Sequence, residues 1–472
     1  MPGLMPRPRT CLIRGGAVVN ADGERRADVL VEGETIVLVE AELDARALPP
    51  NTRVIDASGK LVFPGFIDPH VHVHLPFMGT NAADDHDSAS RAALAGGTTT
   101  IIEMICPGPK DEPLASFEEW HTRAAASSRC DFAFHQAVVR WDDLAKSQLR
   151  ELVDTQGQTS VKVFLAYKGA LDLPDAQLLE LLDFSAQEGV IVTAHCENAD
   201  AVAYMQARLL AEGKTGPEWH EPSRPTCVEA DGVQHFATCC QLTGAHGYVV
   251  HTSCRAALEQ AARARKRGAN IQVECVVPHL VLDDSCTHRP NFEGAKFVMS
   301  PPLRTFADQQ ALWEGLASRE VATIGTDHAP FHFATQKVMG RERFTAIPNG
   351  IGSIQERIDL VHTYGVCAGR LTYAAMVDAC STQVARTFGL FPRKGTIAPG
   401  SDADIVVYDP ARRGTFRHAD NQGALDYCAY EGMERIGATE TVLRRGEVVV
   451  EHGRTIAPPG GGRYLRRERR TS

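Results

Sequence analysis

Histidine and aspartate residues follow several apolar segments of this 472-residue sequence, in positions where they could bind a metal ion. One segment leads into PHVH at residues 69–72, and His70 and His72 could reach one ion because alternate residues of a strand face the same side. Three further apolar segments end at or just before a possible ligand: His195, His251 and Asp327. A single histidine is more often a hydrogen-bonded core residue, but these four imidazoles and one carboxylate are donors that zinc prefers. The pattern therefore predicts a metal site.

Lys162 lies in the middle of the apolar stretch SVKVFL at residues 160–165. A buried ammonium group without a partner costs a large amount of free energy, so a central strand seldom contains lysine. Two interpretations stay open for this residue. Its long side chain could extend to the end of the strand and reach water, or a covalent modification could remove its charge.

The elements that must position these residues alternate between short apolar segments and helical stretches. Eight apolar segments are expected to be strands, at residues 65–68, 98–105, 131–139, 160–167, 190–195, 247–251, 270–276 and 322–326. Helices are expected between them, for example at 174–187, 256–267 and 306–317. This alternation predicts an α/β fold, a (β/α)8 TIM-type barrel, whose strands would bring the candidate ligands together at their C-terminal ends. An open doubly wound sheet is the alternative, and no glycine fingerprint follows the first strand to support it.

The two ends of the chain differ from this middle part in their sequence pattern. Short β-rich pieces separated by turns fill residues 11–63 and return at residues 393–455. We expect these two stretches to form one small β-sandwich domain, with the barrel spanning residues 64–392. Residues 456–472 are glycine-rich and then basic, and they are expected to be a C-terminal tail that is solvated or contacts a partner.

Composition excludes several classes of protein. There are 49 Lys and Arg residues against 59 Asp and Glu, a net charge of −10, which argues against binding to nucleic acid. No apolar run approaches the roughly 18 residues of a membrane span, and the first residues lack the apolar stretch of a secretory signal. Thirteen cysteines without a CxxC pair favour a reducing compartment, so we expect a cytoplasmic protein that has neither a nucleic-acid nor a membrane partner.

A set of ordered motifs across nearly the whole chain resembles the binuclear amidohydrolase superfamily, in its cyclic-amidase branch of dihydropyrimidinases and hydantoinases. The motifs are PGFIDPHVH at 64–72, LPFMGT at 75–80, AALAGGTTT at 92–100, VKVFLAYKG at 161–169, TAHCEN at 193–198, MSPPLR at 299–304, GTDHAPF at 325–331 and IPNG at 347–350. In that family a lysine carbamylated by CO2 bridges two divalent metal ions, usually zinc. The resemblance implies that Lys162 is this bridge (an N6-carboxylysine), that His70, His72 and Asp327 bind one ion, and that His195 and His251 bind the other.

The resemblance also implies an activity. It suggests that a metal-bridging hydroxide opens the ring amide of 5,6-dihydropyrimidines or 5-substituted hydantoins, small cyclic ureides, to give N-carbamoyl amino acids. Asp327 would accept a proton and pass it to the leaving nitrogen, and Tyr167 would donate to the developing oxyanion. Since Tyr167 is five residues from Lys162, it must lie beyond the regular strand, on a loop over the site. Ser300 and Asn349 match positions that hold the ureide edge. The family further suggests a homotetramer.

Some assignments stay open at the level of sequence. The candidates for the pocket that accepts the ring substituent are His74, Leu75, Phe77, Phe164 and Leu171, and core packing explains the apolar ones about as well. Hydantoinases typically have an acidic residue at the position of His74 and dihydroorotases have an arginine, so this residue matches neither. The alternative functions are an allantoinase or dihydroorotase, a metal-free scaffold relative, and a thiol amidase using Cys196. The last is disfavoured because Cys196 and His195, being adjacent in a strand, would face opposite ways.

Overall fold

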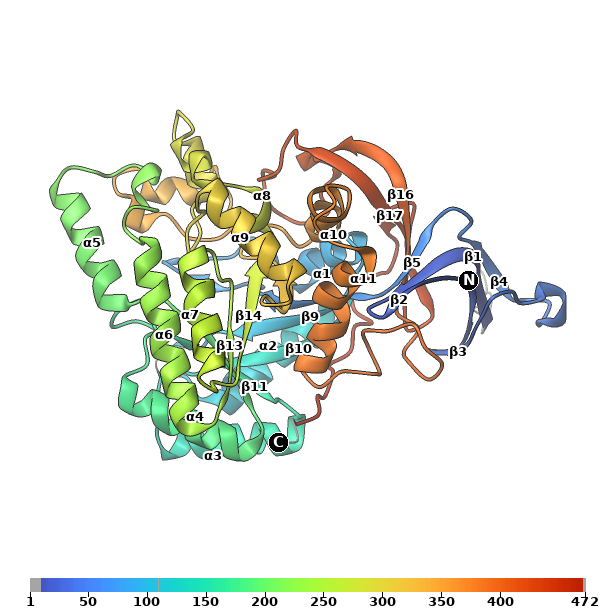
Figure 1. Cartoon of the computed structure of the whole chain (residues 1–472), viewed down its shortest axis with the longest axis horizontal. Coiled ribbons are helices and arrows are strands. Elements are labelled where there is room, and N and C mark those ends of the chain that lie inside the picture. The colour runs from blue at the N-terminus through green and yellow to red at the C-terminus, as the bar shows by residue number, and fades with distance from the viewer. Residues whose placement is uncertain (1–9, 109, 470–472) are drawn as a thin grey trace.

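The computed structural model describes residues 10–108 and 110–469 and places a barrel beside a β-sheet built from both chain ends (Figure 1). Eight parallel strands form the barrel. In sheet order they are β6 (Phe66–Val71), β9 (Thr98–Ile105), β10 (Asp131–Ala137), β11 (Ser160–Phe164), β12 (Ile191–His195), β13 (His246–Val249), β14 (Ile271–Val276) and β15 (Thr323–Gly325). The last strand meets the first where the amide of His72 donates to the carbonyl of His328 at 2.9 Å. The predicted fold class is confirmed, with each strand close to its expected position.

These strands are apolar along nearly their whole length because both of their faces are covered. Every residue of β6, β9 and β10 is buried, as expected for parallel strands that have a filled interior on one side and helices on the other. The longer helices of the barrel are α1 (His86–Ala95), α2 (Pro113–Ser127), α3 (Asp143–Glu151), α4 (Asp175–Glu188), α5 (Ala199–Ala211), α6 (Thr226–Thr243), α7 (Arg255–Lys266) and α9 (Phe306–Ala317). The helices expected at 174–187, 256–267 and 306–317 correspond to α4, α7 and α9.

Short elements complete the barrel region. A two-stranded hairpin, β7 (Pro76–Phe77) and β8 (Thr80–Asn81), follows β6. The remaining α-helices are short: α8 (Val277–Val281), α10 (Arg357–Val361), α11 (Tyr373–Val377) and α12 (Gln383–Thr387). Within the described residues, no helix combines the length and the hydropathy that crossing a membrane would require.

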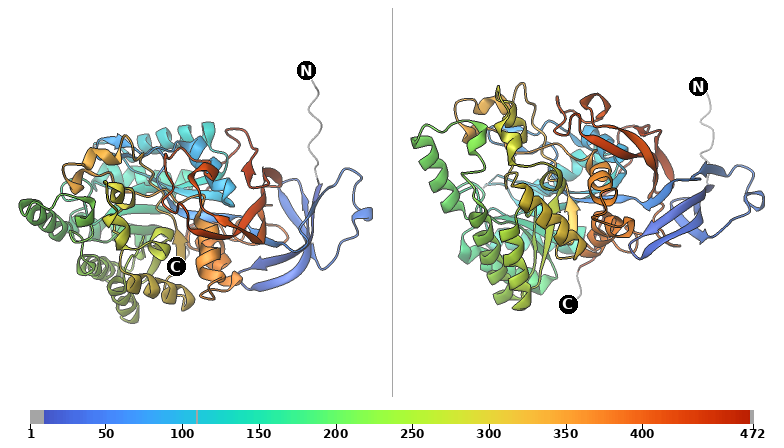
Figure 2. Two further views of the ribbon diagram at one scale, coloured as in Figure 1. Left: turned by 90° about the horizontal axis from the view of Figure 1, so that it is seen from above. Right: turned by 45° about the horizontal axis from the view of Figure 1, so that its top comes forward.

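Both chain ends contribute to one sheet of nine strands, which Figure 2 shows as blue N-terminal strands beside red C-terminal ones. Its strands are β1 (Thr10–Asn20), β2 (Gly23–Glu32), β3 (Thr35–Glu40), β4 (Arg53–Asp56), β5 (Leu61–Pro64), β16 (Ile405–Thr415), β17 (Glu434–Arg444), β18 (Glu447–Glu451) and β19 (Arg454–Thr455). The N-terminal and C-terminal halves join where β5 pairs antiparallel with β16. The prediction that distant ends of the chain build one β unit is confirmed.

Residues 463–468 cross the floor of the barrel, at the N-terminal ends of its strands. The amide of Phe132 donates to the carbonyl of Arg463, and the amide of Leu465 donates to the carbonyl of Phe132. Leu465 and Arg467 are each only 4% exposed. For these residues the expectation of a solvated tail is wrong, because the apolar floor of the barrel takes up Leu465 beside Phe388. The last residues of the predicted tail, 470–472, lie outside the described residues.

Candidate active site

The six predicted metal ligands lie at the C-terminal ends of barrel strands and meet beside one cavity of about 1050 Å³. Three of them lie within strands, namely His70 in β6, Lys162 in β11 and His195 at the end of β12. The other three follow a strand within two residues: His72 after β6, His251 after β13 and Asp327 after β15. All six side chains are buried, so the barrel brings together residues that are up to 257 positions apart in the chain.

Asp327 lies between His70 of β6 and His72, which follows that strand. Its Oδ1 is 3.1 Å from Nε2 of His70 and 3.1 Å from Nε2 of His72. The possible ligand atoms of these three residues lie within 4.8 Å of one another. Asp327 itself has a φ of 50°, in the left-handed region that costs free energy for a residue other than glycine. The surrounding structure holds this conformation, which keeps the carboxylate between the two imidazoles.

His195 and His251 form a second pair beside this cluster. Their ring centroids are 4.5 Å apart, and the ring of His251 stacks on that of His70 at 5.3 Å. His251 also has a positive φ, 40°. The histidines thus form two adjacent groups, as the resemblance implies for two ions.

Burial keeps three of these four imidazoles neutral, the form that binds metal, whereas the carboxylates of Glu274 and Asp327 outweigh burial at His70 and raise its pKa. Burial lowers the pKa of His72 to about 4 and lowers the pKa values of His195 and His251, so all three are neutral near pH 7. Nε2 of His70, Nδ1 of His72 and Nδ1 of His251 are buried without a hydrogen-bond partner among the described residues. Buried polar atoms normally have partners, so this unsatisfied set of nitrogens next to a carboxylate fits divalent metal ions.

Lys162 is 1% exposed in the middle of β11. Burial lowers the pKa of its amine, and its Nζ lies 5.2 Å from the centroid of the Phe164 ring. The side chain stays inside the barrel and also lines the cavity. This burial disfavours the interpretation in which the lysine extends to water, and the covalent modification that would remove its charge stays a prediction.

Two buried glutamates orient the histidines from behind, and sequence reasoning missed both. Glu274 of β14 accepts hydrogen bonds from Nδ1 of His70 at 2.7 Å, from the amide of His251 at 3.0 Å and from Tyr248 Oη at 3.0 Å. Glu197 pairs with Nε2 of His195 at 2.6 Å. The available signal was an acidic residue inside the apolar segment IQVECV, and another in TAHCEN.

Glu197 also holds an arginine beside the predicted catalytic tyrosine. Burial alone would raise the pKa of Glu197, but Arg224 at 2.5 Å and the hydrogen bond with His195 hold this pKa at about 2. The guanidinium carbon of Arg224 lies 5.6 Å from the centroid of the Tyr167 ring. Arg224 is therefore a cavity-lining charge, missed from sequence, that Glu197 already neutralises.

Tyr167 lies on the loop after β11, as its spacing from Lys162 predicts. Its φ of 64° is in the left-handed region, and its ring centroid is 5.4 Å from that of His195. Burial raises the pKa of its phenol to about 12, so the hydroxyl keeps its proton near pH 7 and can donate a hydrogen bond. In the lining of the same cavity, Nδ2 of Asn349 donates to Oγ of Ser300 at 2.8 Å, which joins the two predicted ureide-binding residues.

The structure also brings together all five candidates for the substituent pocket. They line the same cavity: His74, Leu75, Phe77, Phe164 and Leu171. The ring of Phe77 meets that of Tyr167 edge-on at 5.6 Å. Cys196, in contrast, is absent from the described residues that line the cavity, and burial raises the pKa of its thiol well above its usual value. This geometry gives no support to a thiol amidase.

Comparison with known proteins identifies the family. The model of the Amidohydrolase family matches residues 61–449, which is more than four fifths of the chain. The chain belongs to the amidohydrolase family. Among curated members, this amidohydrolase is 40% identical to a D-hydantoinase of Geobacillus stearothermophilus, covering 97% of this chain and 96% of that protein. It is 36% identical to a dihydropyrimidinase of Rattus norvegicus, covering 97% and 88%. The predicted family resemblance is confirmed.

Solved structures agree with this assignment over the full length of the amidohydrolase chain. A D-hydantoinase (dihydropyrimidinase) from Thermus sp. superposes with a TM-score of 0.94 at 50% identity, covering 97% of this chain and 99% of that one. An L-hydantoinase (dihydropyrimidinase) from Arthrobacter aurescens has a TM-score of 0.88 at 26% identity, covering 96% and 99%. The described fold, including the sheet from both chain ends, is therefore shared with hydantoinases.

Proposed function

We propose that this amidohydrolase is a metal-dependent cyclic amidase, which hydrolyses the ring amide of 5,6-dihydropyrimidines or 5-substituted hydantoins to N-carbamoyl amino acids. The observation that carries this proposal is the convergence of the His70–His72–Asp327 cluster, His195, His251 and Lys162 on one side of a cavity. Tyr167, Ser300 and Asn349 line the same cavity, so a cyclic ureide held there would contact these three residues beside the proposed metal ligands. The related D-hydantoinases and dihydropyrimidinases support the class of substrate.

The metal centre that we propose contains two zinc ions. His70, His72 and Asp327 would hold one ion, His195 and His251 the other, and a CO2-derived carbamate on Lys162 would bridge them. The carbamate accounts for a lysine that is buried without exposure to water, because it replaces a cation with anionic oxygen donors. Two bound divalent ions would supply an activated water at neutral pH.

The side chains of this protein would then transfer the proton, stabilise the oxyanion and position the substrate. The Asp327 carboxylate would take the proton of the attacking water and pass it to the ring nitrogen as the carbon–nitrogen bond breaks. The phenol of Tyr167 would donate a hydrogen bond to the carbonyl oxygen as that oxygen gains negative charge. Ser300 and Asn349 would hold the ureide edge in register with these groups, and Phe77 and Leu75 would face the ring substituent.

The purified holoenzyme tests the reaction directly. We expect close to two zinc ions per chain and ring opening of dihydrouracil or a 5-substituted hydantoin, with dihydroorotate and allantoin opened more slowly. A protein without bound metal and without turnover on any of these four substrates would overturn the proposal. Dihydroorotate or allantoin as the best substrate would overturn the subclass.

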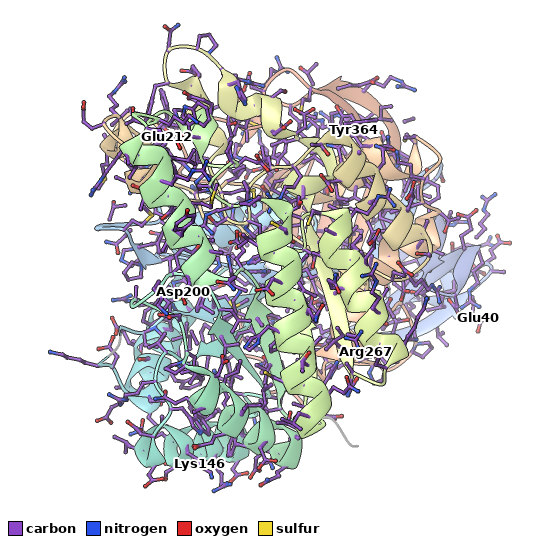
Figure 3. All side chains as sticks on the ribbon, turned by 60° about the vertical axis from the view of Figure 1, so that its left-hand side comes forward. Glu40, Lys146, Asp200, Glu212, Arg267 and Tyr364 are labelled. Atoms are coloured by element: carbon purple, nitrogen blue, oxygen red, sulfur yellow. The ribbon has the colours of Figure 1, made fainter. Side chains whose placement is uncertain are left out.

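The Lys162→Ala variant tests the bridge. We expect loss of metal binding and of activity, with partial recovery when a small carboxylate such as acetate is added to take the place of the carbamate. Lys146→Ala is the matched control, because Lys146 is exposed on α3 and does not line the cavity (Figure 3 labels its position). Full activity of Lys162→Ala without additives would contradict the proposed centre.

We also propose a cytoplasmic homotetramer. The thirteen cysteines are all free thiols, which fits a reducing compartment. Association of the chains could bury apolar side chains that are exposed in the single chain, such as Tyr204 of α5, Leu242 of α6 and Phe306 of α9. Light scattering on the holoenzyme after size-exclusion chromatography should give the mass of four chains. The mass of a single chain would contradict the tetramer.

A further inference from the structure

Lys337 is a second buried lysine, and the proposed chemistry does not use it. It begins a 3-10 turn, Lys337–Gly340, and its side chain is fully buried. Its Nζ donates hydrogen bonds to three backbone carbonyls, those of Val298 at 2.9 Å, Pro348 at 2.7 Å and Gly350 at 2.8 Å. All three acceptors are neutral, so this cation is held by peptide dipoles.

The number of acceptors identifies the form of the amine. An ammonium group has three N–H donors and no lone pair, which matches three carbonyls, whereas a neutral amine has only two donors. Burial lowers the pKa of Lys337 well below its usual value, whereas hydrogen bonds from an ammonium group to three carbonyls favour the charged form. A cation is costly in this place, and methionine would fill nearly the same volume without that cost. The cost of burying this cation therefore suggests that the three hydrogen bonds have a positional role in the structure.

The three carbonyls belong to the two loops that carry Ser300 and Asn349. Val298 lies two residues before Ser300, and Pro348 and Gly350 are the two neighbours of Asn349 in the chain. The loops also bond to each other directly, through the amide of Gly350 and the carbonyl of Val298 at 2.9 Å. Lys337 thus ties both loops to one point from the side away from the cavity, since it does not line the cavity itself.

We propose that Lys337 is a positioning residue that fixes the separation of the Ser300 and Asn349 loops and thereby sets the affinity for the ureide edge of the substrate. This inference rests on the proposed function for its substrate but not for its structural step. Without the ammonium, the buried carbonyls of Pro348 and Gly350 lose this partner, the carbonyl of Val298 keeps only the amide of Gly350, and the loops move apart. The metal ligands come from other segments, so the metal centre and the bond-breaking step should be affected little.

Lys337→Met tests the proposal, because methionine keeps the volume and removes the donors. We expect KM for the best ring substrate to rise at least 10-fold, with kcat within 3-fold of the parent and unchanged metal content. Lys296→Met is the matched control. Lys296 lies in the segment before Ser300 and pairs with Glu293, so its replacement should leave KM unchanged. A Lys337→Met enzyme with a lowered melting temperature and an unchanged KM would overturn the positioning role.

Chemical rescue gives a second test that a purely structural role would not pass. In Lys337→Ala the three carbonyls remain and a space opens beside them, so added methylammonium or ethylammonium should lower KM again. The same salts should do nothing for Lys337→Met, whose side chain fills the space. An identical response of both variants to the salts would contradict the proposal.

Hydrogen exchange separates this inference from the proposed function. In Lys337→Met the amide of Gly350 should exchange at least 10-fold faster than in the parent, while amides of β11 and β12 stay unchanged. This measurement needs no substrate. If the parent enzyme opens no cyclic ureide but the Gly350 amide of Lys337→Met exchanges faster, the proposed function fails and the loop-positioning role stands. If the exchange rate of Gly350 is the same in Lys337→Met and the parent, the loop-positioning role is overturned.

Discussion

Glu274 shows how much of this site depends on single residues behind the ligands. One carboxylate accepts hydrogen bonds from the ring of His70, the backbone of His251 and the hydroxyl of Tyr248. It thereby fixes which nitrogen of His70 carries the proton and leaves Nε2 free toward Asp327. Partners of this kind orient metal-binding histidines and raise their basicity.

Replacing this carboxylate should weaken the metal centre without removing a ligand. For Glu274→Gln we expect metal affinity to fall by about 10- to 100-fold, because an amide is a weaker acceptor and one of its groups donates. Competition with a chelator, followed by measurement of zinc per chain, checks this. Glu320→Gln, at an exposed site, is the control. Equal zinc retention by both variants would show that Glu274 has no such role.

The hydroxyl of Tyr167 can be tested separately from its ring. Tyr167→Phe keeps the edge-on contact with Phe77 but removes the hydrogen-bond donor, so kcat should fall by about 10²- to 10³-fold while zinc content stays the same. Tyr204→Phe, which alters an exposed phenol on α5, should leave kcat unchanged. Steady-state kinetics on the best ring substrate measure this effect. A decrease in kcat of less than 3-fold for Tyr167→Phe would argue against an oxyanion role.

At the scale of elements, the segment 463–468 acts as a floor for the barrel. Arg467 donates from its guanidinium to Oγ of Ser160 at 2.7 Å and to the carbonyl of Phe134. Ser160 begins β11, two residues before Lys162, and also bonds to His135 at 2.6 Å. Burial lowers the pKa of Arg467 to about 10, which is still high enough to keep its charge near pH 7. The end of the chain therefore stabilises the strand that carries the proposed bridge.

Removing this guanidinium should destabilise the barrel. Arg467→Met removes the guanidinium donor from the Phe134 carbonyl and leaves the Ser160 hydroxyl only its bond with His135, which costs about 2 kcal/mol. A loss of this size should lower the melting temperature of such a large chain by a few degrees, about 4 °C. Arg466→Met is the control, since the neighbouring side chain is exposed. Calorimetry checks the difference, and equal melting temperatures would contradict a stabilising floor.

The contact between the terminal sheet and α10 should respond to pH. Burial raises the pKa of Asp359 to about 7, although Arg435 lies 3.9 Å away and Tyr408 Oη donates to it at 3.0 Å. In the unfolded chain this carboxyl titrates near its ordinary value of about 3.9, so the folded state binds its proton more tightly. The contribution of this group to the free energy of unfolding therefore decreases as pH rises from about 4 to about 7.

Asp359→Asn should remove that decrease, because an amide does not titrate. Urea unfolding at pH 5 and at pH 8 should show the variant gaining stability relative to the parent as pH rises. Asp183→Asn, at an exposed position on α4, should follow the parent at both values. A constant difference between Asp359→Asn and the parent at the two pH values would show that Asp359 does not titrate in this range.

At the scale of the whole molecule, metal ions should add stability to a barrel that is already folded. Its core is apolar and continuous, from strands such as β9 and β10 to the covering helices, and does not depend on the ligand cluster. Ions that bind only the folded chain stabilise it by about 4 kcal/mol when present at 1,000 times their dissociation constant. Chelation should therefore lower the melting temperature while far-ultraviolet circular dichroism stays unchanged. Loss of the helical signal on chelation at 25 °C would contradict this.

Local pattern was enough to predict most of the architecture. The strands of the barrel are short apolar runs separated by helices, and eight such repeats favour a parallel barrel over an open doubly wound sheet. The histidines, Asp327 and Lys162 were found because each is a polar residue in or directly after an apolar run. Tyr167 was placed on a loop because strand alternation excludes it from the face of Lys162.

What the sequence alone determined is therefore the set of strands and the donor types at their ends, because these depend on residues close together in the chain. Only the tertiary structure decided which groups hydrogen-bond to these ligands, strands and loops and so position them. Glu274 meets His70 across 204 positions, and Arg467 meets Ser160 across 307. Lys337 binds backbone carbonyls, which carry no sequence signal. Such contacts depend on how the barrel closes and on what covers its floor, and that packing is a property of the whole chain.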